Sequence, residues 1–105
     1  IRLMEKESNV KVPKLKTDGG ASANDFLLQF QADVAHVTVE RPLIREITAL
    51  GAAYLAGLSA YVYDKQRICD SWKADAVFMP QRSRLETDLE YVRWKKGVSK
   101  AMGWC

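Results

Sequence analysis

The clearest hydrophobic pattern in the sequence lies just after Gly20, where apolar side chains recur at intervals of three and four residues. Such spacing predicts a helix with one apolar face, formed by Ala23, Phe26, Leu27, Phe30 and Val34. Ser22 suits the N-cap of this helix, and Asp25 would complete a weak capping box while complementing the helix dipole. We therefore predict an amphipathic helix that begins beside Ser22.

Short apolar segments on either side of this helix have the spacing of strands. Residues 14–17 follow Pro13, which has no N–H for a ladder and therefore belongs at a strand's start. Residues 36–40 form the second segment, with Val37 and Val39 on one face and Pro42 after its end. A strand, a helix and a strand in succession predict a βαβ unit with parallel strands and a right-handed crossover.

Residues 46–61 predict a second strong helix that is apolar nearly all round. Such a helix is expected to be buried on several sides. Gly51 and Gly57 each cost about 1 kcal/mol relative to alanine inside a helix, so we expect close packing against both.

The remaining segments have weaker patterns. Residues 1–7 resemble the end of a helix that is closed by Asn9. Residues 64–72 predict a short polar helix. Residues 78–80 predict an extended connection. Residues 85–102 predict a last helix with two apolar stripes, which would touch two surfaces or be kinked, and with a basic polar face.

The composition is that of an ordinary globular domain. The chain has 105 residues, of which 48% are apolar and 28% charged, and a net charge of +3 spread along its length. This charge indicates solubility and not nucleic-acid binding. The most apolar stretch is shorter than the about 20 residues that a membrane span needs. No signal peptide is visible, and Cys69 and Cys105 are expected to be free thiols. We therefore expect a cytoplasmic protein without nucleic-acid or membrane partners. Since the chain begins with Ile1, we expect it to be part of a longer protein.

Residues 17–24, Thr-Asp-Gly-Gly-Ala-Ser-Ala-Asn, occupy the predicted turn from strand to helix. Gly19 and Gly20 allow the backbone to approach another molecule closely, and a helix start offers unpaired N–H groups and partial positive charge. This combination suits a phosphate-bearing ligand. A Gly-Gly pair alone is a weak signal, because most such pairs only make turns.

The longer string from Asp18 to Asp33 closely resembles the C-terminal nucleotide-binding region of glycerol kinases, in the FGGY sugar-kinase family. Two further stretches match the family in the same order. One is Val-Glu-Arg-Pro at 39–42 with Thr-Ala-Leu-Gly-Ala-Ala at 48–53, and the other is Trp-Lys-Lys-Gly-Val at 94–98 with Met-Gly-Trp at 102–104.

The resemblance implies an α/β chain that is a fragment of the actin-like ATPase (ribonuclease H-like) fold, with a parallel βαβα unit plus C-terminal helices. Residues 1–71 would be part of the nucleotide-binding domain, and residues 72–105 a C-terminal extension ending in an amphipathic helix. It implies that the Gly20 backbone contacts ATP or ADP near the phosphates and that the Asn24 side chain binds the adenosine end. Asp25 departs from the family, which often has a second Asn there.

The implied function is transfer of a phosphoryl group from ATP to glycerol. The catalytic base, the glycerol contacts and most of the Mg²⁺ site would lie in the remainder of the kinase chain. No catalytic or metal-binding residue is therefore expected in these 105 residues, and this fragment alone is expected to be inactive. The intact enzyme is expected to form a homo-oligomer. Alternatives are a non-catalytic nucleotide-binding or interaction module, a kinase for another sugar, or a basic C-terminal helix that docks on anionic membrane.

Overall fold

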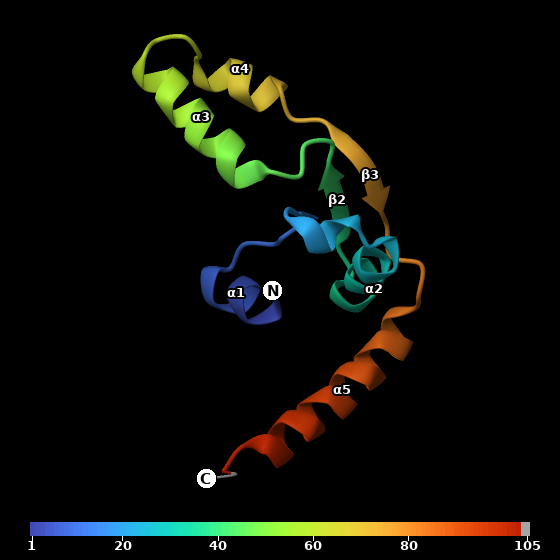
Figure 1. The fold of residues 1–105 in the computed structure, drawn as a ribbon. Coiled ribbons are helices and arrows are strands. Elements are labelled where there is room, and N and C mark those ends of the chain that lie inside the picture. Colours follow the sequence, from blue (N-terminus) through green and yellow to red (C-terminus); the bar gives the residue numbers. More distant parts are fainter. Residues whose placement is uncertain (104–105) are drawn as a thin grey trace.

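The computed structural model describes residues 1–103, which form a small sheet with helices at both of its ends. The elements in chain order are α1 (Arg2–Ser8), β1 (Lys14–Lys16), the 3₁₀ helix η1 (Gly20–Ala23), α2 (Asp25–Ala35), β2 (Thr38–Pro42), α3 (Ile47–Ser59), α4 (Lys65–Asp70), β3 (Ala74–Phe78) and α5 (Arg84–Ala101). The molecule is elongated, 52 × 35 × 29 Å, because α3 and α4 project from one end of the sheet and α5 from the other (Figure 1).

The three strands have the order β1-β2-β3. β1 and β2 are parallel, with Leu15 opposite Val39, which confirms the predicted βαβ unit. β3 is antiparallel to β2 and was not predicted; its last residue, Phe78, is the first residue of the extended connection expected at 78–80. The prediction that β2 ends before Pro42 is wrong, because the strand includes this proline at an irregularity in its register with β3. A break in the ladder is where a sheet tolerates proline.

The core lies between α2 and the sheet and is formed by Leu28, Ala32, Val37 and Val39. The predicted common face of Val37 and Val39 is confirmed. The apolar face predicted for α2 is wrong, because Phe26 is 79% exposed while Leu28 is only 2% exposed. α2 is apolar on two sides, and periodicity alone cannot decide which side meets the sheet.

α3 is an apolar helix with little cover. Gly57 is its only buried residue in the described structure, and Leu55 is 70% exposed, so the expected burial on several sides is not met within this chain. Close packing is confirmed at Gly57, where an added Cβ would lie 2.1 Å from Cδ2 of Tyr63, but an added Cβ at Gly51 would have no neighbour within 4 Å.

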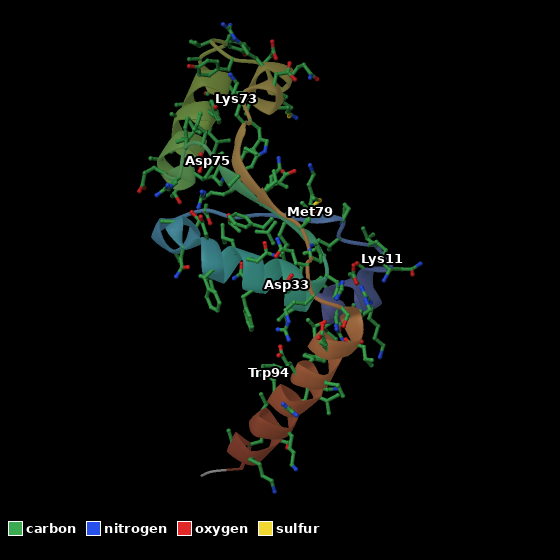
Figure 2. The ribbon with its side chains drawn as sticks, turned by 90° about the vertical axis from the view of Figure 1, so that its right-hand side faces the viewer. Lys11, Asp33, Lys73, Asp75, Met79 and Trp94 are labelled. Carbon is green, nitrogen blue, oxygen red and sulfur yellow. The ribbon has the colours of Figure 1, made fainter. Side chains whose placement is uncertain are left out.

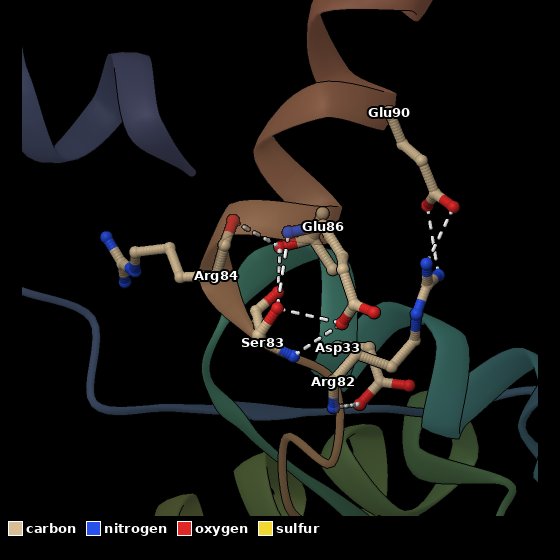
Figure 3. Close-up of polar contacts among 7 residues, drawn as sticks. Asp33, Arg82, Ser83, Arg84, Glu86 and Glu90 are labelled. Atoms are coloured by element: carbon tan, nitrogen blue, oxygen red, sulfur yellow. Dashed lines mark hydrogen bonds and ion pairs between the residues drawn. The ribbon is translucent and has the colours of Figure 1, made fainter.

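The start of α5 is fixed by polar contacts, which are partly buried at Asp33 and exposed at the N-cap (Figure 3). The carboxylate of Asp33, on α2, accepts hydrogen bonds from the backbone N–H groups of Gln81 at 2.7 Å and Arg82 at 3.4 Å. Ser83 and Glu86 then form a reciprocal capping box. These contacts explain why the chain turns from β3 into a helix at this point.

Beyond its first turns, α5 has little cover. Tyr91 and Trp94 stack on each other and, with Phe30 and Val34 of α2, line a groove of about 320 Å³. Tyr91 and Trp94 belong to the second predicted apolar stripe, whose last members, Val98 and Met102, are exposed. None of the helices in this part of the chain combines the length and hydropathy needed to cross a lipid bilayer.

Candidate functional site

The predicted turn after β1 is attached to the end of β2 and to the loop that follows it. The backbone N–H and the hydroxyl of Thr17 both donate to the carbonyl oxygen of Glu40, at 3.0 and 3.2 Å. The N–H of Gly19 donates to the carbonyl oxygen of Arg45 at 3.2 Å. Gly19 has φ 75°, in the left-handed region, which is why glycine is suited to this position.

Ser22 closes this turn and does not cap α2 as predicted. Its N–H and hydroxyl donate to the carbonyl oxygen of Gly19 at 3.1 and 2.6 Å, and the side chain is buried. The N-cap is Asn24, whose Oδ1 accepts a hydrogen bond from the Leu27 N–H at 3.1 Å. The sequence prediction placed the cap too early because the 3₁₀ turn η1 separates the glycines from α2.

Gly20 and Asn24, the two residues predicted to contact a nucleotide, both lie on the surface. An added Cβ at Gly20 would have no atom within 4 Å, so a ligand can approach the backbone there. Since the oxygen of the Asn24 amide is used by the cap, its N–H₂ group is the part of the side chain that is available to donate. Asn24 is the N-cap of α2, where the helix dipole is positive, and Gly20 begins η1, the 3₁₀ turn that precedes it.

Arg41, at the end of β2, connects this turn to the rest of the sheet. Its Nη1 donates to the carbonyl oxygen of Ser22 at 3.3 Å and to Oδ1 of Asp25, while its Nε donates to Oδ2 of Asp75 at 2.8 Å. The Arg41 side chain is only 11% exposed. Its hydrogen bond to Asp25 raises the pKa of Arg41 above the ordinary value. Arg41 belongs to the Val-Glu-Arg-Pro stretch, but nothing in the spacing of residues predicts these contacts.

A second groove does not coincide with the turn. It has a volume of about 550 Å³, lies between α3, α4 and the end of β2, and is mainly apolar; its lining includes Ile44, Ile47, Leu50, Ile68 and Trp72. Neither Gly20 nor Asn24 belongs to its lining. The apolar walls suit covering by another part of a protein better than binding of a charged nucleotide.

Comparison with known proteins assigns this chain to a family. Residues 1–60 match the model of the C-terminal domain of the FGGY family of carbohydrate kinases. The chain belongs to the FGGY family of carbohydrate kinases. The family assignment and the fold class expected from the resemblance are therefore confirmed.

Individual FGGY relatives extend over nearly the whole chain. Glycerol kinase 2 of Thermotoga maritima is 49% identical over 99% of this chain and 21% of its own length. Glycerol kinase of Thermococcus kodakarensis is 48% identical over 95% of this chain and 20% of its own length. The crystal structure of Plasmodium falciparum glycerol kinase with ADP matches with a TM-score of 0.79 and 26% identity, over 97% of this chain and 21% of that chain. This FGGY chain thus spans about a fifth of the length of the curated relatives it matches.

Some of the other predictions for this FGGY chain concern residues that lie outside the described structure. Cys69 is exposed and has a free thiol, whereas Cys105 and Trp104, the end of the last family stretch, lie outside residues 1–103. Nε2 of His36 is buried, with no hydrogen-bond partner in the described part of the chain. Within the same residues no group of three or more His, Cys, Asp or Glu side chains could hold a metal ion.

Proposed function

We propose that this chain is the C-terminal part of an ATP-dependent glycerol kinase, which transfers the terminal phosphoryl group of ATP to glycerol and releases ADP and glycerol 3-phosphate. The chain supplies one wall of the nucleotide site. The backbone of Gly20 contacts the nucleotide near its phosphates, and the Asn24 side chain donates to the adenosine end. Family membership and the glycerol kinase relatives support the reaction.

The observation that carries the proposal is the open turn before α2. The backbone beside Gly20 has free space, and the exposed Asn24 presents its amide next to the positive end of α2. An anionic ligand is stabilised at such a position by N–H groups and by the helix dipole. The structural match to a kinase crystallised with ADP supports a nucleotide as this ligand.

The proposal assigns the rest of the reaction to other residues. The base for the glycerol hydroxyl, the glycerol contacts and the coordination of Mg²⁺ belong to the remainder of the kinase chain, so this chain alone is inactive. In this division residues 1–71 are part of the nucleotide-binding domain, and residues 72–105 are a C-terminal extension. The complete enzyme is proposed to be a cytoplasmic homo-oligomer.

The exposed apolar surface of α3 supports this division. Leu55 is 70% exposed, and the groove of about 550 Å³ beside α3 has mainly apolar walls. A domain that worked alone would leave this surface in water, at a free-energy cost of about 25 cal/mol per Å² of apolar area. We propose that the remainder of the kinase chain covers it.

A kinetic assay of the full-length protein tests this function. Formation of ADP that requires both ATP and glycerol, with glycerol 3-phosphate identified by mass spectrometry, is the expected result. Comparison with xylulose and gluconate as acceptors tests the sugar. Phosphorylation of one of these in preference to glycerol would replace the substrate, and binding of ADP without any turnover would favour a non-catalytic nucleotide-binding module.

A further inference from the structure

We propose that Arg41 is a positioning residue for the nucleotide: it holds the segment that carries Asn24 in its binding conformation and neutralises the carboxylate beside it. This inference rests on the proposed function, because it assumes that the turn binds a nucleotide. It adds a residue that lies behind the turn.

The contacts on the turn side surround Asn24. Arg41 donates to the Ser22 carbonyl oxygen at 3.3 Å, two residues before Asn24, and to the carboxylate of Asp25, the residue directly after it. Ser22 in turn donates its N–H and hydroxyl to the carbonyl oxygen of Gly19. One guanidinium therefore connects to both sides of Asn24 and, through Ser22, to the glycine turn.

The contacts on the other side fix the guanidinium itself. Nε of Arg41 donates to Asp75 of β3 at 2.8 Å, and the guanidinium carbon lies 5.7 Å from the ring centre of Phe78. Figure 2 shows Asp75 near the start of β3, at the end of the strand opposite to Asp33. An arginine held by hydrogen bonds and by an aromatic ring has few alternative conformations. It can therefore transmit the position of the sheet to the turn.

Charge gives Arg41 its second role. Asp25 is 71% exposed and directly follows Asn24, so it lies beside the turn at which the anionic nucleotide would bind. An unpaired carboxylate there would repel the negatively charged nucleotide. Arg41 supplies the opposite charge from a side chain that is only 11% exposed, so it neutralises Asp25 from a largely buried position.

Two changes separate the two roles. Arg41→Gln removes both the charge and the multiple hydrogen bonds, and is expected to raise the dissociation constant for ADP and the KM for ATP about tenfold while kcat changes less. Asp25→Asn keeps an oxygen that can accept from Arg41 and removes the negative charge, so binding is expected to stay within about twofold. The double variant is expected to regain the electrostatic part of the loss.

The experiment measures ADP affinity by calorimetry and ATP kinetics in the full-length kinase. Arg93→Gln is the matched control, because it makes the same change in charge at an exposed position on α5. The proposal is supported if Arg41→Gln weakens ADP binding about tenfold and the control leaves it unchanged. Equal loss in both variants would show a general effect of charge and overturn the proposal, as would lower thermal stability of Arg41→Gln with unaltered ADP affinity.

A second variant covers the case in which Arg41→Gln does not fold. Arg41→Lys keeps the charge, but one ammonium group cannot reach Asp75 and the turn in the same way, so ADP affinity is expected to fall about threefold. Unaltered affinity in that variant would overturn the positioning role. If the unmodified kinase binds no ADP, the proposed function fails and this inference fails with it; if it binds ADP equally well with and without Arg41, only this inference fails.

Discussion

Replacement of Asp33 by alanine is expected to detach α5 from the body of the molecule. Asp33 is 5% exposed, and its carboxylate accepts from the N–H of Gln81 at 2.7 Å, from the Gln29 side chain at 3.0 Å and from the N–H of Arg82 at 3.4 Å. Gln29 also donates to the carbonyl oxygen of Met79. One carboxylate thus joins α2 to the segment between β3 and α5.

The size of the effect follows from these bonds. A hydrogen bond to a charged group contributes about 1.5–3 kcal/mol, and the bond at 3.4 Å adds little. Because Gln29 keeps its second acceptor and Gln81 is exposed to water, we expect Asp33→Ala to lower the free energy of opening at this junction by about 3 kcal/mol. Asp33→Asn keeps one acceptor oxygen and is expected to lower it by about half as much.

The pH dependence of the junction has a definite sign. Burial by itself would raise the pKa of Asp33, but the hydrogen bonds from Gln81, Gln29 and Arg82 outweigh it and hold the pKa below the ordinary value. The stabilisation is therefore complete above the unfolded pKa of about 3.9 and is lost as the pH falls through the lower folded value. In Asp33→Asn this acid-dependent loss should be absent.

Hydrogen–deuterium exchange of the amides at Gln81 and in the first turn of α5 measures this opening. Asp70→Asn is the matched control, because Asp70 accepts from Gln66 at 2.9 Å with the same four-residue spacing but is exposed. Exchange at the junction that is equally fast in Asp33→Ala and in the control would refute the role given to Asp33.

Four further substitutions have expected outcomes. Gly57→Ala should lower the free energy of unfolding by about 1–3 kcal/mol, because the added Cβ would meet the Tyr63 ring. Gly51→Ala, whose added Cβ has open space around it, should raise the free energy of unfolding by up to about 1 kcal/mol. Thermal melts compare the two variants, and equal shifts in melting temperature would contradict the close packing at Gly57. Ser83→Ala removes the capping box and should cost about 1 kcal/mol of α5 stability, measured by helical circular dichroism. Asn24→Ser retains a capping oxygen but lacks the amide, so it should weaken ADP binding while helix content stays constant; an unchanged ADP affinity would remove Asn24 from the site.

The sequence predicted the helices and strands better than it predicted their tertiary contacts. The βαβ unit, the glycine turn and the long helices followed from spacing that depends only on near neighbours in the chain. The face of α2 that meets the sheet did not, since Phe26 and Leu28 are equally apolar and only tertiary contacts distinguish them. β3 was missed because Ala74–Phe78 is short and its pairing with β2 depends on residues far away in sequence.

The candidate site was predicted in its exposed parts only. The resemblance carried by a string of neighbouring residues implied Gly20 and Asn24, and both lie on the surface, Gly20 at the start of η1 and Asn24 at the N-cap of α2. The contacts of Arg41 join three segments of the chain, so no local pattern contains them. The cap at Asn24 was misplaced to Ser22 because the 3₁₀ turn has no strong signature of its own.

The central claim is that the turn before α2 forms one wall of a nucleotide site. A crystal structure of the full-length protein with ADP tests it most directly. The account predicts ADP with its phosphates beside the Gly20 backbone and the adenosine within hydrogen-bond distance of the Asn24 amide. ADP bound elsewhere, with the surface at Gly20 and Asn24 open or covered by another segment of the chain, would contradict it.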